Sequence, residues 1–453
     1  MWHTLELRVE TPVFNSAGTE GVPHLHTPPE IRVPSLRGGM RFWLRAMAAM
    51  YVGDDPRRLR KVEDLVFGTT ARTESSDERL SSPVRMRIAE GPSSSSSGHR
   101  KQPHDTFPQE THQRMWLAYM LGPGLAKKGN LPKGTFIPPG VTYTLRIARN
   151  GSNNEDTDRA YQCALGALWL LLAYGGVGAR TRRGFGRLSI TDRGESLPDG
   201  WSSTMDTPSL DFFEGLDHLE RSGPAEDCQP ALRAICAKVM GCSPEQLSRD
   251  VWPDGAITPF PVMGAGHTVA GISSERFTKW HEALSSAGRE LRFFRAERNR
   301  EHTAGRIARK ENGTYLPPEI KTQGWTDIIG GEVQGETRML RAALGLPLVY
   351  KGGQEVRVTR GRGDNEQQLR RASPLRMFPV GNDQRGWRLF SFGFRSALLP
   401  TDADVKIFGG RADGRKLDVR AEDAHNLTDQ WIETLSKGET FVRGTTQDDR
   451  DRP

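Results

Sequence analysis

A glycine- and arginine-rich segment, residues 175–187, has the residue types best suited to binding phosphate groups. It contains five glycines, four arginines and no acidic residue. Glycine lets the backbone adopt positive φ and approach a ligand closely, while arginine forks and successive amides suit phosphate oxygens. Phe185 is expected to offer a stacking face for a base. The segment therefore predicts contact with an RNA backbone, through Gly176, Gly178, Arg180, Arg182, Arg183, Gly184 and Phe185.

Two other interpretations of this segment have to be weighed. Glycine-rich loops also hold the pyrophosphate of nucleotide cofactors, but there the loop follows a strand and opens a helix. Here an apolar helix is expected before the segment and a strand after it, and no Gly-Lys-Ser or Gly-Lys-Thr sequence is present. A turn that only joins the helix to the strand remains the second alternative, and no cofactor is predicted.

A second basic group lies in residues 32–45. Arg37, Arg41 and Arg45 are spaced by four residues and share one face of the helix that Ser35 is expected to cap. The Gly38-Gly39 pair would then lie at the helix start, where amides and the helix dipole favour an anion. We expect Arg37, Arg41 and Arg45 to line one groove with the loop residues Arg180, Arg182 and Arg183. Arg32, Gly38 and Gly39 are expected as further RNA contacts, and a solvated basic face is the alternative.

Two weaker basic groups lie further along the chain. The arginines of residues 292–310 alternate with Phe293 and Phe294 but also with glutamates, so a helix with internal salt bridges is an equal interpretation. Arg370 and Arg371 form a basic turn before an expected strand, and Arg371 is selected as a further RNA contact.

Little in the sequence indicates catalysis. The 11 histidines are scattered, and neither a GxSxG nor an HExxH sequence occurs. The DxD pairs at residues 156–158 and 402–404 and the pair His104-Asp105 match metal sites only by their letters. His24 and His26 could act as general acid or base in RNA cleavage, since histidine titrates near neutrality. We predict a protein that is not an enzyme and holds no metal.

Periodicity indicates the elements that position these residues. Alternating apolar residues predict strands around residues 5–9, 84–88, 141–147 and 188–190, and three- to four-residue spacing predicts helices over 36–50 and 161–174. The order strand, helix, strand, strand, helix, strand is typical of a ferredoxin-like fold, which RNA-recognition modules share. Residues 1–195 are therefore expected to form a ferredoxin-like domain.

The rest of the chain divides by its composition. Residues 196–337 are expected to be mainly helical, with helices near 210–219, 231–240 and 274–287. Short strands near 356–359, 375–380 and 388–394 predict a second, smaller sheet domain over 338–442. The Ser-rich loop 91–98 and the charged tail 443–453 are expected to lack order.

The composition suits a protein of the cytoplasm. A net charge of +7 and a hydrophobic fraction of 36%, with 49 glycines and 29 prolines, indicate a globular chain with long polar loops. The four cysteines lack CxxC spacing and suit a reducing compartment. The N-terminus has no secretory signal pattern, and the most apolar run is too short to cross a bilayer.

Residues 175–187 resemble the signature of the RAMP superfamily of CRISPR systems, a loop of the form GGxGxRxRRGFG before the last strand of a ferredoxin-like domain. Further segments resemble one branch, the first-numbered RAMP subunits of the type III-B (Cmr) effector complex. These segments are residues 11–14, 31–45, 65–68, 344–347 and 370–375.

The resemblance implies an α+β protein with two ferredoxin-like (RRM-like) domains and a largely helical insertion. It implies a non-catalytic subunit that holds the 3′ part of the guide crRNA, helps capture target RNA in antiviral defence and contacts other Cmr-type subunits. A metal-independent RAMP endoribonuclease that processes guide precursor is the enzyme alternative. A scaffold that touches only protein is a third.

Overall fold

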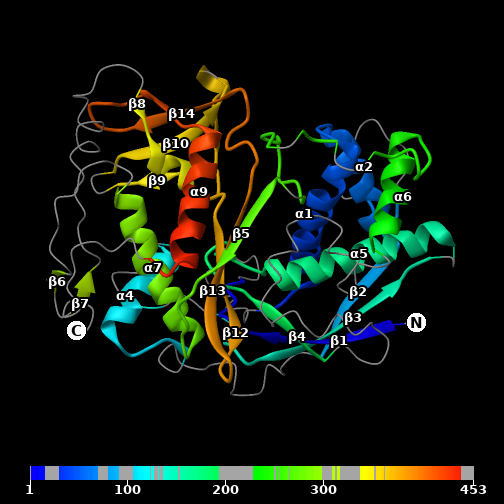
Figure 1. The fold of residues 1–453 in the computed structure, drawn as a ribbon, viewed down its shortest axis with the longest axis horizontal. Coiled ribbons are helices and arrows are strands. Elements are labelled where there is room, and N and C mark those ends of the chain that lie inside the picture. Colours follow the sequence, from blue (N-terminus) through cyan, green and yellow to red (C-terminus); the bar gives the residue numbers. More distant parts are fainter. Residues whose placement is uncertain are drawn as a thin grey trace. The chain divides into compact units, whose positions relative to one another are not determined.

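The computed structural model describes most of the helices and strands that the sequence predicts. The described residues are 2–15, 30–69, 80–90, 106–122, 124–126, 131, 136–151, 154–192, 228–248, 251–253, 255–264, 266–297, 309–311, 314–316, 337–350, 353–361 and 363–439. The Ser-rich loop 91–98, the expected helix at 210–219 and the tail 443–453 lie outside them. The chain is a mixed α/β protein with mainly antiparallel sheets (Figure 1).

The chain divides into two compact units, each made of several segments. Unit 1 comprises residues 1–106, 134–268 and 380–385, and unit 2 comprises residues 107–133, 269–379 and 386–453. These segments differ from the expected boundaries at 195 and 337. Hydrophobic patterning reports which residues are buried, but it does not report which distant segment covers them.

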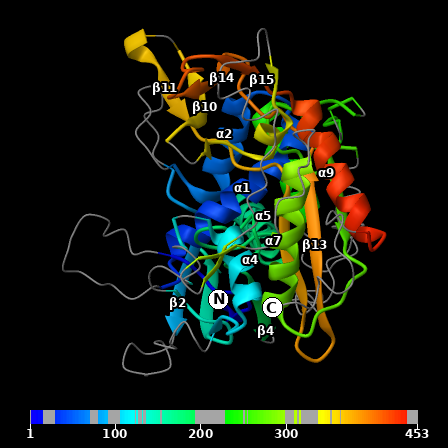
Figure 2. The same ribbon diagram turned by 90° about the vertical axis from the view of Figure 1, so that its left-hand side faces the viewer.

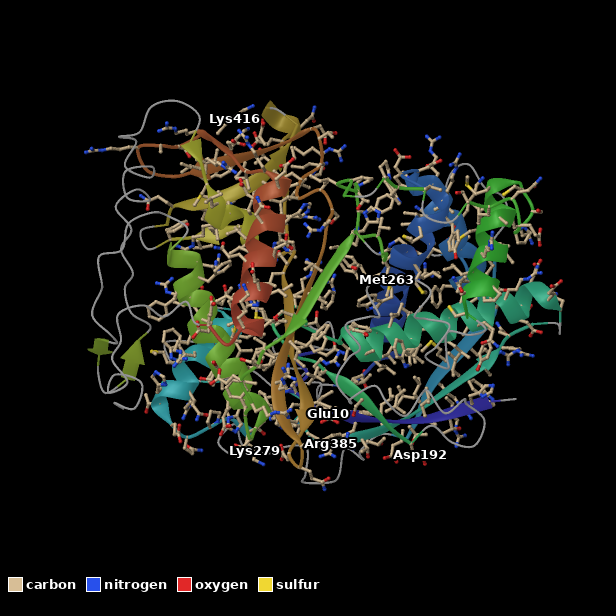
Figure 3. The ribbon with its side chains drawn as sticks, viewed as in Figure 1. Glu10, Asp192, Met263, Lys279, Arg385 and Lys416 are labelled. Atoms are coloured by element: carbon tan, nitrogen blue, oxygen red, sulfur yellow. The ribbon has the colours of Figure 1, made fainter. Side chains whose placement is uncertain are left out.

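A four-stranded antiparallel sheet is the base of unit 1. Its order is β2 (Val84–Glu90), β3 (Thr142–Arg149), β1 (Trp2–Val9) and β4 (Leu188–Asp192). The predicted alternation is confirmed, because Leu5, Leu7 and Val9 are fully buried while their neighbours face outward. Glu10 follows β1 directly and Asp192 ends β4, in neighbouring strands of the sheet (Figure 3).

Two helices, α1 (Val33–Val52) and α5 (Glu155–Tyr174), pack on this sheet (Figure 1). Helices α2 (Pro56–Phe67) and α6 (Cys228–Met240) pack on α1 and α5. The side chain of Asn154 accepts the Thr157 N–H at 2.8 Å, and three acidic residues follow in the first turn, so α5 begins where capping and dipole rules place it. Met263 lies beside α1, where its N–H donates to the carbonyl of Ala46 at 2.9 Å (Figure 3).

Unit 2 contains two larger sheets. One has the order β11 (Gln367–Leu369), β10 (Glu355–Arg360), β14 (Ala403–Phe408), β15 (Lys416–Asp418) and β8 (Thr337–Arg338), and β9 (Leu348–Val349) also pairs with β10. The other has the order β12 (Arg376–Asn382), β13 (Gly386–Phe394) and β5 (Thr268–Ile272). A small hairpin joins β6 (Arg309–Glu311) to β7 (Thr314–Leu316).

This arrangement differs from a second ferredoxin-like domain built on one four-stranded sheet. The described strands of residues 338–442 are divided between two sheets, and β5 from the expected helical region completes one of them. The apolar residues on β12 and β13 include Phe378, Phe390 and Phe392, whose rings contact one another and are buried.

In unit 2, helices α7 (Trp280–Glu297) and α9 (Ala421–Ser436) pack on β13, and α4 (Thr111–Leu121) packs on α7 (Figure 2). The unit also has two short 3-10 helices, η5 (Leu340–Leu344) and η6 (Gly363–Asn365). Trp431 on α9 is fully buried and donates to Ser391 Oγ on β13 at 3.0 Å. None of the helices formed by the described residues is long and apolar enough to cross a membrane.

Candidate nucleic-acid interface

The glycine-rich loop joins α5 to β4, as the sequence predicts, but most of its glycines make room for the protein's own backbone. A Cβ on Gly186 would lie 2.0 Å from the carbonyl oxygen of Val177, and one on Gly178 would lie 2.5 Å from that of Phe14. Both glycines have positive φ, of 76° and 85°. The loop therefore owes its shape to close backbone contacts that only glycine permits.

Hydrogen bonds hold the loop against the segment that follows β1. The Gly186 N–H donates to the carbonyl of Pro12 at 3.0 Å, and the Ala179 N–H donates to that of Phe14 at 2.8 Å. Thr11 is fully buried, and its hydroxyl donates to the carbonyl of Gly184 at 2.8 Å. The loop is thus held in one conformation by hydrogen bonds to residues 11–14.

Arg180 is placed at the turn of this loop. Its φ is +64°, a left-handed conformation that costs a non-glycine residue free energy and is concentrated at functional sites. The side chain is half-buried, and this burial lowers its pKa from the ordinary value. Among the described residues, no hydrogen-bond or ion-pair partner is found for its guanidinium. Arg182 and Arg183 are also half-buried on the same loop.

Arg187, the last arginine of the segment, has a structural role that the sequence did not reveal. It is fully buried, and its guanidinium donates to the carbonyls of Gly175 at 2.6 Å and Ala173 at 2.9 Å, which satisfies the last turn of α5. Burial lowers the pKa of Arg187, while the nearby Glu10 carboxylate opposes that change. Burial likewise raises the pKa of Glu10, although a hydrogen bond from Ser189 acts against it.

The stacking role expected of Phe185 is wrong. Its ring is fully buried and meets Phe14 edge to face at 5.6 Å between centroids. An aromatic residue between glycines is equally suited to anchoring a loop in the core, and the hydrophobic free energy of a buried phenyl ring decides the outcome here.

The anion site expected at the Gly38-Gly39 pair is also wrong, because α1 begins earlier than predicted. Arg32 is the N-cap residue, and Pro34 occupies the first turn. Gly38 and Gly39 are therefore inside the helix, where intrahelical hydrogen bonds use their amides. A Cβ on Gly39 would lie 2.6 Å from Leu171 Cδ1, so this glycine permits close packing of α1 on α5.

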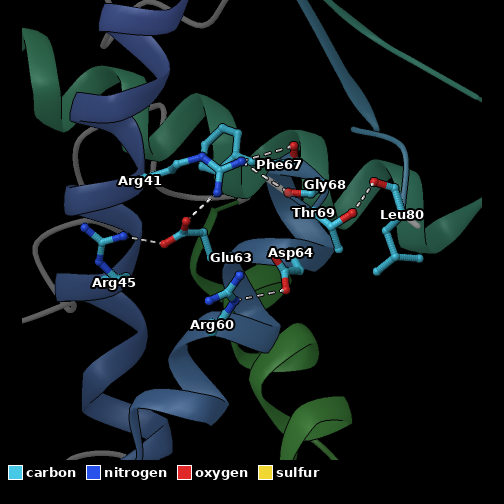
Figure 4. A network of polar contacts seen from close by, with 9 residues as sticks. All are labelled: Arg41, Arg45, Arg60, Glu63, Asp64, Phe67, Gly68, Thr69 and Leu80. Carbon is cyan, nitrogen blue, oxygen red and sulfur yellow. Dashed lines mark hydrogen bonds and ion pairs between the residues drawn. The ribbon is translucent and has the colours of Figure 1, made fainter. Parts of the chain in front are cut away.

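The arginine stripe of α1 faces α2 and β2. Arg41 and Arg45 both form ion pairs with the single carboxylate of Glu63, and Arg41 also donates to the carbonyls of Phe67 at 3.4 Å and Gly68 at 3.2 Å (Figure 4). Arg41 therefore satisfies the C-terminal end of α2 in addition to carrying charge.

Arg37 and Arg45 differ in how strongly the protein holds them. The Arg37 guanidinium donates to the carbonyl of Val84 at 2.7 Å, and burial, followed by the charge of Arg41, lowers its pKa. The Arg45 side chain is 44% exposed, whereas that of Arg41 is 13% exposed. Of the stripe, Arg45 is the residue best placed to meet a partner.

The remaining expected contact, Arg371, lies in unit 2. Its guanidinium donates to the carbonyl of Ala397 at 2.6 Å, and its backbone pairs with that of Leu346 in both directions. Burial lowers its pKa. In this conformation Arg371 ties two chain segments together.

The structure does not bring the expected residues into one groove. On α1, Gly39 and Trp43 contact the end of α5, where the loop starts, since a Cβ on Gly175 would lie 2.9 Å from Trp43 Nε1. Arg37 and Arg41 are turned by roughly 150° about the helix axis from that side, at 100° per residue. The loop arginines and the α1 stripe are thus two separate basic groups of unit 1.

The residues that could indicate metal chemistry are engaged elsewhere. Asp156 pairs with Lys238 at 2.7 Å, Asp402 with Arg360 at 2.6 Å, and Asp404 with Lys416 at 2.7 Å. Within the part of the chain that the structure describes, no group of three or more His, Cys, Asp or Glu side chains could hold a metal ion. His24, His26 and the pair His104-Asp105 lie outside the described residues.

The N-terminal part of the chain matches a known protein family. Residues 6–189 match the model of the RAMP superfamily. Over 196 residues the chain is 31% identical to CRISPR system Cmr subunit Cmr1-1 of Pyrococcus furiosus. This match covers 43% of this chain and 49% of the relative. It is 27% identical over 164 residues to subunit Cmr1-2 of the same organism, and this match covers 36% of this chain and 83% of that relative. The chain thus matches about half the length of the first relative.

Two solved structures are similar at the level of the whole chain. The crystal structure of Cmr1 from Pyrococcus furiosus, in its apo form, has a TM-score of 0.48 at 18% identity, covering 95% of this chain and 97% of that one. A chain in the cryo-EM structure of the Type III-B Cmr-beta bound to cognate target RNA has a TM-score of 0.43 at 11% identity. This match covers 96% of this chain and 99% of that one.

Proposed function

We propose that this chain, whose residues 6–189 match the model of the RAMP superfamily, is a non-catalytic, RNA-binding subunit of a type III-B CRISPR effector complex. In this role it holds the 3′ part of the guide crRNA, helps capture target RNA and contacts other Cmr-type subunits. The identity to Cmr1-1 over 196 residues supports this assignment. The strand order β2-β3-β1-β4 supports a ferredoxin-like fold for the N-terminal part.

The observation that carries the proposal is the state of Arg180. Its guanidinium has no described partner, and the positive φ of its backbone is held by a loop braced on residues 11–14. A preorganised arginine that is charged and half-desolvated loses little conformational freedom when it binds a phosphate oxygen. Arg182 and Arg183 on the same loop would extend the contact along the RNA backbone.

The two groups of α1 have different parts in this proposal. Arg45, which is largely exposed, contacts RNA directly, whereas Arg37 and Arg41 keep the ends of β2 and α2 in position. Such contacts reach phosphates and not base edges, so binding should tolerate many sequences.

Salt-dependent RNA binding of the full chain tests this function. For single-stranded RNA, each phosphate contact contributes about 0.7 to the slope of log affinity against log salt concentration. Arg180→Gln should lower this slope by about that amount and weaken binding to unrelated RNAs equally. Arg57→Gln, which removes the same charge from an exposed position on α2, is the matched control. Strong preference of the wild type for one sequence, or an equal effect of both variants, contradicts the proposal.

The enzyme and scaffold alternatives give different results in the same system. Incubation with guide precursor in the presence of a chelator should leave the RNA intact, and a discrete cut would favour the endoribonuclease. The double substitution Arg182→Glu and Arg183→Glu should lower the RNA content of the purified complex, whereas a scaffold that touches only protein predicts no change.

A further inference from the structure

Unit 2 contains a cluster of arginines and tyrosines that the proposed function does not use. Tyr119 comes from α4, Arg292 and Arg295 from α7, Arg341 from η5, and Tyr350 follows β9. Helices α4 and α7 run side by side in both views of the unit (Figures 1 and 2). Three parts of the chain that are far apart in the sequence, α4, α7 and residues 341–350, thus meet here, and α7 and η5 supply three guanidinium groups.

The contacts within the cluster fix its geometry. The Arg292 guanidinium lies over the Tyr119 ring at 5.7 Å, and that of Arg341 lies over the Tyr350 ring at 5.5 Å. Arg295 is only 8% exposed, and its Nη1 donates to the Tyr119 hydroxyl at 3.4 Å. The other four residues are half-buried. Arg295 is therefore the most buried member of the cluster, and the other four residues are partly accessible to solvent.

Two charges of this cluster, those of Arg295 and Arg341, are not balanced by the described residues. Burial lowers the pKa of Arg341, and the neighbouring charges of Arg295 and Arg292 lower it further. Among the described residues, no carboxylate forms an ion pair with Arg295 or Arg341, and the buried Nε atoms of both have no hydrogen-bond partner. Buried cations normally have a partner of opposite charge, because desolvation is costly without one.

We propose that this cluster is a binding site for a phosphate monoester, either the terminal phosphate of an RNA chain or that of a free nucleotide. Guanidinium forks donate in parallel to phosphate oxygens, and tyrosine hydroxyls add further donors. The two unpaired cations, Arg295 and Arg341, match a dianion better than the single charge of a phosphodiester, so the site distinguishes a terminal phosphate from an internal one. The inference does not depend on the loop of unit 1.

Binding of matched pairs of ligands to the full chain tests the site. One arm compares a short RNA with a terminal phosphate, at either end, with the same RNA ending in hydroxyl groups, and the other compares a nucleoside monophosphate with its nucleoside. We expect the phosphorylated ligand to bind on the order of tenfold more tightly in at least one arm, as a charge-assisted pair of hydrogen bonds provides. A preference in the RNA arm alone identifies an RNA end, and one in both arms identifies a nucleotide ligand.

Substitutions then connect the preference to the cluster. Arg341→Gln should abolish the difference between phosphorylated and hydroxyl ligands, and Arg292→Gln is a second variant in case the first does not fold. Arg411→Gln, at an exposed position of unit 2, should leave it unchanged. Equal binding of both ligands by the wild type, or a preference that survives in folded Arg341→Gln and Arg292→Gln, overturns the inference. Arg180→Gln should leave the preference intact, so failure of the loop proposal can be recognised separately.

Discussion

Replacing Gly186 by alanine should force the backbone of the glycine-rich loop apart at Val177 and residue 186. The new methyl group would lie 2.0 Å from the carbonyl oxygen of Val177, a distance that backbone atoms cannot accommodate, and the φ of +76° disfavours any L side chain. In the native loop, the N–H of Val177 donates to the carbonyl of Gly186 at 2.9 Å. The variant must therefore separate the two sides of the loop.

The expected cost follows from these two terms. A left-handed conformation costs alanine about 1–2 kcal/mol, and loss of the hydrogen bond between Val177 and Gly186 costs about 1 kcal/mol. Their sum, about 2–3 kcal/mol, corresponds to roughly a 30- to 150-fold rise in local opening. Since the loop carries Arg180, RNA affinity should fall even though the variant leaves every arginine in place.

Hydrogen–deuterium exchange, measured by mass spectrometry on peptides that span residues 175–187, reports this opening directly. Gly38→Ala is the matched control, because a Cβ there meets nothing within 4 Å and alanine stabilises a helix interior by about 0.5–1 kcal/mol. Unchanged exchange of the loop in Gly186→Ala, or equal acceleration of exchange there in Gly38→Ala, would refute the close-packing argument.

Three further predictions concern other contacts. Glu63→Gln should lower the free energy of unfolding, measured by urea titration, by about 1–3 kcal/mol, because it leaves two guanidinium groups without their carboxylate. As a control, Arg60→Gln removes an exposed ion pair with Asp64 at 4.0 Å and should change this free energy by less than about 0.5 kcal/mol. Gly39→Ala should destabilise α1 despite its better helix propensity, since the methyl would displace Leu171; a raised melting temperature would contradict this. Burial lowers the pKa of His425 below its ordinary 6.5, so its contribution to the free energy of unfolding should be complete above about pH 6.5. That contribution should be lost as pH falls through the lowered folded-state pKa, by at most about 1.4 kcal/mol per pH unit. In His425→Gln the urea midpoint of unfolding should depend less on pH over that range.

Local periodicity was sufficient to predict the four strands of the unit 1 sheet and helices α1, α5 and α6, whereas α2 was missed. The alternation of Leu5, Leu7 and Val9 and the apolar spacing of α1 and α5 show which face of each element is buried, because that periodicity is contained in the local sequence. The position of the loop between α5 and β4 followed from the same patterns. The start of α1 was missed although a signal was present, because proline at Pro34 is typical of a first helical turn.

The partners of charged side chains could not be predicted in this way. Glu63 lies 22 residues from Arg41, and nothing in the spacing indicates that one carboxylate serves two arginines. The roles of Phe185 and Arg187 depend on their burial, which the tertiary structure decides. The division of the C-terminal strands between two sheets also depends on pairing over long sequence distances, which alternation within one strand does not report.

The interleaving of the two units has a consequence for synthesis of the chain. Helix α4 is made between β2 and β3 but packs on α7, and Ser285 Oγ donates to the carbonyl of Gln113, 172 residues earlier. At about 5–20 residues per second, a ribosome needs roughly 10–30 s to supply the second half of that contact. During this interval the buried face of α4, which includes Met115 and Trp116, is exposed on the nascent chain. The segment between the first strands of unit 1 should therefore depend on chaperone protection until α7 emerges.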